Sequence, residues 1–209
     1  MAGVDGSQNR ALRAVGYGVV SVNSLWLSFS LRARLGFCSM LGQVRWGRAV
    51  VSKALAANPD DTYALATLAH WASQDQAWEA ARDLLSRCVA IDPEDVQAWF
   101  NLGFTFERLE QFEEAERCFR RATERAPALD RAWYGLALAL IAQDRLVEAV
   151  EVLQVNTRLQ PMSPYGWYQL ARVQADLGAL DDAIATIARL RQFEPKVARQ
   201  LERETGLCA

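Results

Sequence analysis

Apolar residues recur along most of this chain at the three- and four-residue spacing of amphipathic helices. Trp99, Leu102 and Phe106 fall on one face of a predicted first helix. Ala115 and Phe119 mark the corresponding face of a second helix that follows almost at once. Because only a few residues connect these two helices, they must pack antiparallel. The pattern therefore predicts a helical hairpin.

The hairpin pattern repeats with a period of 34 residues. Five of the six prolines are separated by this interval, namely Pro59, Pro93, Pro127, Pro161 and Pro195. A small residue keeps the same period after each central leucine, at Ala69, Gly103, Ala137 and Ala171. A fixed period of this size indicates stacked repeats, in which no single unit can bury its apolar face alone.

Helix ends are predicted at the same points of each repeat. Each proline is expected to stop a second helix, because it cannot donate a backbone hydrogen bond and it clashes with the preceding turn. Residues that favour helix starts follow, and we expect them to cap the next first helix. They are Asp60 with Asp61, Asp95, Asp130, and Ser163 followed by Pro164.

The repeat resembles the tetratricopeptide repeat (TPR) family, whose 34-residue pattern begins W-x2-L-G-x2-Y and ends in Pro. The matching residues are Trp99, Leu102, Gly103, Phe106, Ala115, Phe119, Ala122 and Pro127. Two later residues depart, since Asn156 stands where a small Ala is usual and Gln174 where an aromatic is usual. The resemblance implies an all-α fold, a right-handed α-solenoid of TPR helix-turn-helix hairpins with a C-terminal cap helix.

The repeats divide the chain into segments. Four full repeats are placed at 62–95, 96–129, 130–163 and 164–195, together spanning 62–195. A degenerate TPR-like unit at 25–61 precedes them, and its second helix fits the pattern better than its first. Residues 196–209 are a predicted capping helix and tail, with Val197 and Leu201 facing inward.

Charge and composition change near the N-terminus. Residues 1–61 hold seven basic residues against three acidic ones, although the whole chain has a net charge of −2. Residues 1–24 are expected to form a basic and apolar leader, disordered or membrane-associated. Residues 14–31 are uncharged over the minimum length of a membrane span. Their Ser, Asn and Gly residues, however, bring the expected free energy of membrane insertion close to zero. A membrane anchor, a cleaved targeting segment and a variable leader with a first helix covering the end of the solenoid all stay open.

Composition and motifs exclude several functional classes. The acidic balance lacks the excess of Lys and Arg with which general nucleic-acid binders displace counterions from phosphates. Because the four cysteines form no CxxC pair and His70 is the one histidine, neither a zinc site nor a dense disulfide framework is expected. No nucleotide-binding, hydrolase or metalloprotease signature occurs. We therefore expect no metal, no cofactor and no enzymatic activity, with a site using His70 and a cysteine as the enzymatic alternative.

The family resemblance also implies a concave groove lined by the first helices. The partner-binding residues carried over from the family pattern are Tyr63, His70, Gln97, Phe100, Asn101, Phe104, Arg108, Arg131, Tyr134, Leu138, Ile141, Tyr165, Tyr168 and Arg172. A contiguous aromatic and apolar patch of this kind is typical of a binding site. Burial of Phe100 and Phe104 by neighbouring helices or by the N-terminal segment is the alternative. The clamp that holds acidic chaperone tails in some family members is incomplete here, so we do not expect chaperone-tail binding.

Together these features predict a non-enzymatic protein–protein interaction scaffold or adaptor. Another protein would place an extended peptide or an amphipathic helix in the groove. The alternative is a membrane-tethered TPR assembly factor anchored by residues 14–31. Only two of the 23 basic residues are Lys, which favours a GC-rich, bacterial source. We expect a cytoplasmic location, with inner-membrane association as the alternative, and a homo-oligomer through exposed helix ends also stays open.

Overall fold

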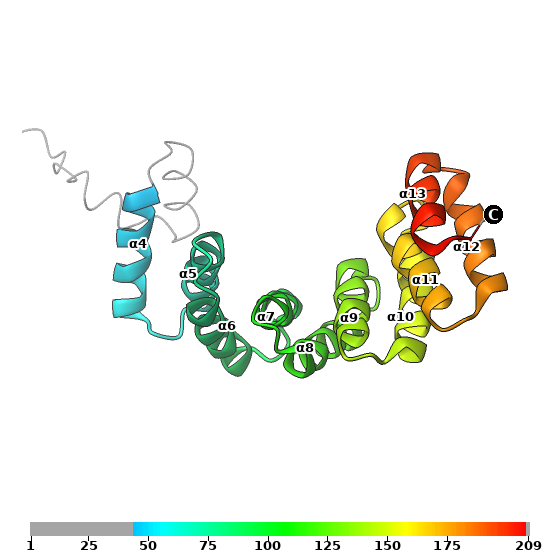
Figure 1. Ribbon diagram of the computed structural model, residues 1–209. Coiled ribbons are helices and arrows are strands. Elements are labelled where there is room, and N and C mark those ends of the chain that lie inside the picture. The colour runs from blue at the N-terminus through cyan, green and yellow to red at the C-terminus, as the bar shows by residue number, and fades with distance from the viewer. Residues whose placement is uncertain (1–43, 208–209) are drawn as a thin grey trace, which may run out of the picture. The chain divides into compact units, whose positions relative to one another are not determined.

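The computed structural model describes residues 44–207, and the ten elements in this range are all α-helices (Figure 1). The chain divides into two compact units, Met1–Pro59 and Asp60–Ala209. In the first unit the described element is α4 (Val44–Ala57). This helix lies where the sequence predicts the second helix of the degenerate repeat.

The remaining predictions for the N-terminal part lie outside the described residues. They concern the leader at 1–24, the uncharged stretch at 14–31 and the first helix of the degenerate unit at 25–61. Among the helices that the structure describes, none combines the length and the apolar character needed to cross a membrane.

The second unit is a succession of helical hairpins followed by one further helix. Its helices are α5 (Thr62–Gln74), α6 (Trp78–Ile91), α7 (Val96–Arg108), α8 (Phe112–Arg125), α9 (Asp130–Ala142), α10 (Leu146–Leu159), α11 (Pro164–Asp176), α12 (Leu180–Arg191) and α13 (Pro195–Thr205). The first helices of the hairpins, α5, α7, α9 and α11, begin at the four residues where the sequence places the repeat starts. Each hairpin packs against the next, so the apolar faces are buried between neighbours.

Aspartates cap two of the first helices. The carboxylate of Asp61 accepts a hydrogen bond from the backbone N–H of Ala64 at 3.0 Å. The carboxylate of Asp95 accepts hydrogen bonds from the backbone N–H groups of Gln97 and Ala98 at 2.9 and 3.1 Å. Both caps satisfy amide groups that have no partner within the helix.

At the other two first helices, the predicted cap at Asp130 is wrong, whereas Ser163 and Pro164 occupy the predicted cap and first helical positions. Asp130 is the first residue of α9 and follows Leu129, which holds the cap position without a side-chain bond. Ser163 precedes α11 at the cap position, but its side chain accepts no hydrogen bond from the helix. Asp130 instead places a negative charge in the first turn, and Pro164 supplies a φ angle already suited to a helix start.

The turn within each hairpin uses one residue in the left-handed conformation. These residues occupy one place of the repeat, with φ angles of 59°, 59°, 57° and 74° at Gln76, Glu110, Asp144 and Gly178. The next backbone N–H donates to a carbonyl five residues earlier in each case, as in a Schellman motif. Glycine adopts this conformation without a steric penalty, whereas Gln, Glu and Asp at the other three positions are strained by it. The turn geometry therefore repeats even where its sequence does not.

A buried phenylalanine on α8 joins α7, α8 and α9. Phe119 has 1% of its surface exposed and packs in the same core cluster as Leu136 and Leu140. Gly103 on α7 and Gly135 on α9 provide the space for its ring, because a Cβ at these positions would lie 2.9 and 2.6 Å from ring atoms. These contacts fix the spacing of the central first helices.

Helix α13 closes the C-terminal end of the second unit. Leu201 is fully buried as predicted, and Val197 is half-buried. Ala198, which the pattern did not single out, is also fully buried. Pro195 begins α13 rather than ending the preceding repeat, so the observed helix starts one residue before the predicted cap at 196–209. The helix ends at Thr205, and the following Gly206 has a left-handed φ of 72°.

A group of charged and polar side chains ties α8 to α10. The buried carboxylate of Glu116 accepts hydrogen bonds from Arg145 Nη1 at 2.5 Å, Arg120 Nε at 2.9 Å and Gln143 Nε2 at 3.0 Å. Arg145 also pairs with Glu148 at 2.6 Å. Burial alone would raise the pKa of Glu116, but these hydrogen bonds outweigh burial and lower it. We call these five residues the Glu116 cluster.

Candidate functional site

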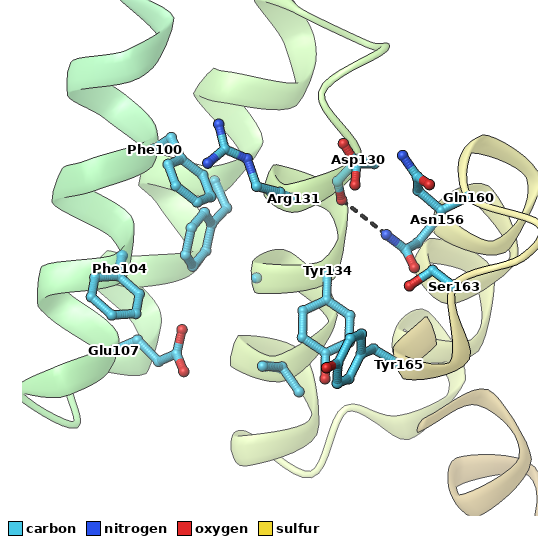
Figure 2. A pocket seen from close by; sticks show the side chains of 13 residues that line it. Phe100, Phe104, Glu107, Asp130, Arg131, Tyr134, Asn156, Gln160, Ser163 and Tyr165 are labelled. Carbon is cyan, nitrogen blue, oxygen red and sulfur yellow. Dashed lines mark hydrogen bonds between the residues drawn. The ribbon is translucent and has the colours of Figure 1, made fainter. Parts of the chain in front are cut away.

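A cavity of about 300 Å³ lies between the first helices α7, α9 and α11 of the second unit (Figure 2). Its lining residues are Phe100, Phe104 and Glu107 of α7, Phe119 of α8, Asp130, Arg131, Tyr134, Gly135 and Leu138 of α9, Asn156 of α10, Gln160 and Ser163 of the connection, and Tyr165 of α11. We call it the central cavity. Its volume is at the lower end for ligand sites, which suits one or two side chains of a larger ligand.

The α7 side of the central cavity is aromatic. The ring centroid of the half-buried Phe100 lies 5.9 Å from that of Phe119. The guanidinium carbon of Arg131 lies 4.9 Å from the centroid of Phe100, within cation–π range. Phe104 meets Trp78 edge-on at 6.1 Å and keeps 42% of its surface exposed. A rigid helix therefore holds a large aromatic ring at the rim, in contact with solvent.

The side of the central cavity away from α7 is polar. Asn156 is buried, and its Nδ2 donates a hydrogen bond to the backbone carbonyl of Asp130 at 2.9 Å (Figure 2). Gly166 on α11 makes room for this side chain, because a Cβ there would lie 2.1 Å from Asn156 Oδ1. The corresponding residues of the earlier first helices are Ala64, Ala98 and Ala132. The polar side of the cavity thus depends on two residues that depart from the repeat together, Asn156 and Gly166.

Two titratable groups of the cavity lining, Tyr134 on α9 and Glu107 on α7, have shifted pKa values. Burial raises the pKa of the Tyr134 hydroxyl, against the effect of a hydrogen bond with Gln169. Burial also raises the pKa of the Glu107 carboxyl, against the effect of the nearby Arg108 charge. Desolvation disfavours the ionised form of both groups. The cavity lining therefore combines aromatic surface with a partly desolvated carboxyl group, that of Glu107.

Comparison with known proteins identifies the repeats. Two family models, both described as Tetratricopeptide repeat, match residues 72–128 and 105–156. The chain therefore contains tetratricopeptide repeats. A search of curated protein sequences finds no match.

Solved structures superpose on this TPR protein over most of its length. A crystal structure of MamA has a TM-score of 0.72 and 18% identity, covering 79% of this chain and 96% of that chain. The MamA 41-end chain from Desulfovibrio magneticus RS-1 has a TM-score of 0.72 and 17% identity, covering 79% and 93%. YrrB, described as a TPR protein with an unusual peptide-binding site, has a TM-score of 0.63 and 20% identity, covering 75% and 84%. The predicted all-α TPR solenoid is confirmed, and TPR solenoids are protein-interaction scaffolds.

Six of the fourteen predicted TPR groove residues line the central cavity, namely Phe100, Phe104, Arg131, Tyr134, Leu138 and Tyr165. Tyr168 and Arg172 line a separate hollow beside α13. The Tyr168 hydroxyl donates a hydrogen bond to the Glu204 carboxylate, and the Arg172 guanidinium carbon lies 5.9 Å from the Tyr168 ring centroid. The cap helix therefore engages the last part of the predicted groove.

The other six predicted residues do not line the central cavity. Exposed members on α5 and α7 are Tyr63, His70, Gln97, Asn101 and Arg108. The Arg108 guanidinium carbon lies 5.3 Å from the Trp78 ring centroid. Ile141 is half-buried and packs against the core cluster instead of facing the cavity. As for the alternative of burial, neighbouring helices half-bury Phe100 but leave Phe104 at the surface.

The lining of the cavity also includes residues that the repeat pattern does not identify as site residues. They are Glu107, Phe119, Asp130, Gly135, Asn156, Gln160 and Ser163. Asn156 and Gly166 both depart from the repeat, in which Ala is usual at the two positions. The two departures belong together, because the Asn156 side chain occupies the space that a Cβ at Gly166 would take. Glu107 gave no such signal, because a carboxylate on a helix is usually a solvated surface residue.

Proposed function

We propose that this TPR protein is a non-enzymatic scaffold that binds an extended peptide or amphipathic helix of another protein in the groove formed by its first helices. The observation that carries the proposal is the central cavity, with Phe104 and Tyr165 exposed on its lining by 42% and 70%. Contiguous exposed apolar surface of this kind marks interaction sites. Buried aromatic anchors at the centre of such sites supply most of the binding energy.

The construction of the cavity favours insertion of a partner's side chains. Its walls belong to helices whose opposite faces pack into the core, and Phe119 fixes α7 and α9 against α8. The lining aromatic residues are therefore preorganised, and little ordering cost falls on this side of the interface. YrrB, which superposes on the chain, is described as a TPR protein with a peptide-binding site, and this supports the same class of ligand.

The enzymatic alternative based on His70 and a cysteine has less support. Burial raises the pKa of the Cys88 thiol to about 11 and that of the Cys118 thiol to about 12, so both stay protonated at neutral pH. Neither cysteine lines the central cavity, and His70 is exposed on α5. Within residues 44–207, no three His, Cys, Asp or Glu side chains are placed to hold a metal ion.

Localisation and assembly stay predictions from the sequence. We propose a bacterial cytoplasmic location and keep the anchor at residues 14–31 as the alternative. Sedimentation with membranes that is lost on deletion of residues 1–35 would favour the anchored form.

Selection from a displayed library of random peptides tests the proposed function. The bait is the full chain, compared with a Phe104→Ala, Tyr165→Ala variant that removes two exposed cavity rings. The matched control is Val147→Ala, Leu180→Ala, which removes two exposed apolar side chains from second helices. Wild type and control should enrich the same peptides, and the cavity variant should bind them at least about tenfold more weakly.

Circular dichroism and thermal unfolding of all three proteins should first show that each is folded. Equal binding by the cavity variant and the control would mean that the groove is only structural. The proposed function would then be wrong.

A further inference from the structure

Glu107 is the feature of the central cavity that best defines its ligand. It lies on α7 one helical turn after Phe104, and its side chain extends toward α9, across the cavity from Tyr134 (Figure 2). The residue is half-buried among aromatic and aliphatic neighbours that include Leu138. An ionised carboxylate in such a place loses much of its hydration.

The charges that face this carboxylate do not neutralise it. Within residues 44–207, Glu107 forms no ion pair, and the charge that acts on it is that of Arg108. The Arg108 guanidinium, however, lies over the Trp78 ring. The other charged residues of the lining are Asp130 and Arg131, and the guanidinium of Arg131 lies over the ring of Phe100. The raised pKa of Glu107 agrees with a desolvated and poorly compensated carboxylate.

We propose that Glu107, Phe104 and Tyr134 form a subsite for one basic side chain, Arg or Lys, of the bound peptide or helix. The aliphatic stem of that side chain packs along the two rings, and its charged head pairs with the Glu107 carboxylate. The ring faces add cation–π attraction to the head group. This inference rests on the proposed function and names the chemistry of its ligand.

Charge complementarity favours a basic residue over the alternatives. A purely apolar anchor would fill the cavity but bury the carboxylate further without a partner, which is unfavourable. An acidic anchor would place two like charges side by side in a poorly solvated space. A basic anchor compensates the acid and still buries apolar surface against Phe104 and Tyr134.

Paired libraries and paired peptides test this subsite. One displayed library of random peptides contains Arg and Lys, and the second is built without them. Each is selected on the full chain, on Glu107→Gln, and on Glu113→Gln as the matched control, since Glu113 is an exposed acid on α8 outside the cavity lining. Wild type and Glu113→Gln should enrich binders from the library with Arg and Lys by about tenfold over the other, and Glu107→Gln should not discriminate.

Individual peptides from the first library then localise the effect. Replacing the critical Arg by citrulline keeps shape and removes the charge. This change should weaken binding to wild type by about tenfold and binding to Glu107→Gln by less than about twofold.

The possible failures separate the two proposals. If peptides bind wild type but tolerate citrulline, or lose equal affinity for wild type and Glu107→Gln, the basic subsite is wrong and groove binding stands. If wild type enriches no peptide above the Phe104→Ala, Tyr165→Ala variant, the proposed function fails and the subsite fails with it.

Discussion

Glu107 and Glu116 belong to the same helical hairpin, and both carboxylates lie in poorly solvated surroundings. Glu116, on α8, accepts hydrogen bonds from two arginines and a glutamine, and its pKa is lowered. Glu107, on α7, faces the central cavity without an ion pair in the described part of the chain, and its pKa is raised. One repeat thus contains a buried carboxylate with hydrogen-bond partners, Glu116, and a half-buried carboxylate that faces a cavity, Glu107.

The difference separates a structural charge from a charge that is left for a ligand. A buried carboxylate with satisfied hydrogen bonds holds its neighbours in one arrangement. A desolvated carboxylate without a partner slightly lowers the stability of the fold. Residues that lower stability in this way are commonly kept where they are needed for function. Substitutions at the two positions should therefore change stability in opposite directions.

The largest expected effect comes from Glu116→Ala. Its removal leaves Arg120, Gln143 and Arg145 without their common acceptor, and we expect a loss of about 2 kcal/mol in the free energy of unfolding. The arginines are partly exposed and recover some hydration, so the loss should stay below that of a fully buried pair. Urea unfolding at neutral pH measures it. Glu113→Ala on the same helix is the control and should change little, and an equal loss in both variants would contradict a specific role of the Glu116 cluster.

The buried polar residue Asn156 is uncharged, and its place in the fold depends on the space that Gly166 leaves for its side chain. Gly166→Ala would force its side chain out of place, and we expect a loss of about 1–2 kcal/mol in the free energy of unfolding. The double variant Asn156→Ala, Gly166→Ala restores the pair of alanines present at Ala122 and Ala132 and should recover at least about 1 kcal/mol of that loss. Additive effects in a double-mutant cycle would show that the two positions are independent.

Much of the fold could be predicted because the repeat places large and small residues at fixed positions. The spacing of Trp99, Leu102 and Phe119 alone indicates the helices, their apolar faces and the close approach between them. The capping side chains were less predictable than the helix starts, because Leu129 and Ser163 precede α9 and α11 without a side-chain hydrogen bond to the helix. At these two helices, Asp130 and Pro164 are residues that favour the first turn of a helix without a side-chain cap.

The candidate site was only partly predictable for a different reason. A repeat pattern indicates which helix face a residue occupies, and Phe104 and Tyr134, which it assigns to the groove face, line the cavity. It does not indicate how far neighbouring hairpins shield that face from water. The burial of Glu107 depends on α9 as well as on α7, so its altered ionisation needs the packed structure.

A smaller change of opposite sign is expected for Glu107→Gln. The neutral amide removes a desolvated charge, and we expect the free energy of unfolding at neutral pH to rise by about 0.5 kcal/mol. The same urea experiment tests it, with Glu113→Gln as the matched control. A clear loss of stability would mean that Glu107 has a structural partner and would remove the contrast with Glu116.

Titration gives the finest test of the contrast, because it leaves the chain unchanged. Carboxyl carbon chemical shifts followed by NMR should give Glu107 a midpoint above the ordinary value of 4.5 and Glu116 a midpoint below it. For Glu116 the lowered pKa stabilises the fold above the ordinary value, and this contribution is lost as pH falls through the lowered pKa. For Glu107 the raised pKa means that ionisation destabilises the fold, so the advantage of Glu107→Gln should disappear as pH falls through the raised pKa. A Glu107 midpoint at or below 4.5 would show that desolvation does not destabilise its ionised form, and the contrast with Glu116 would then be wrong.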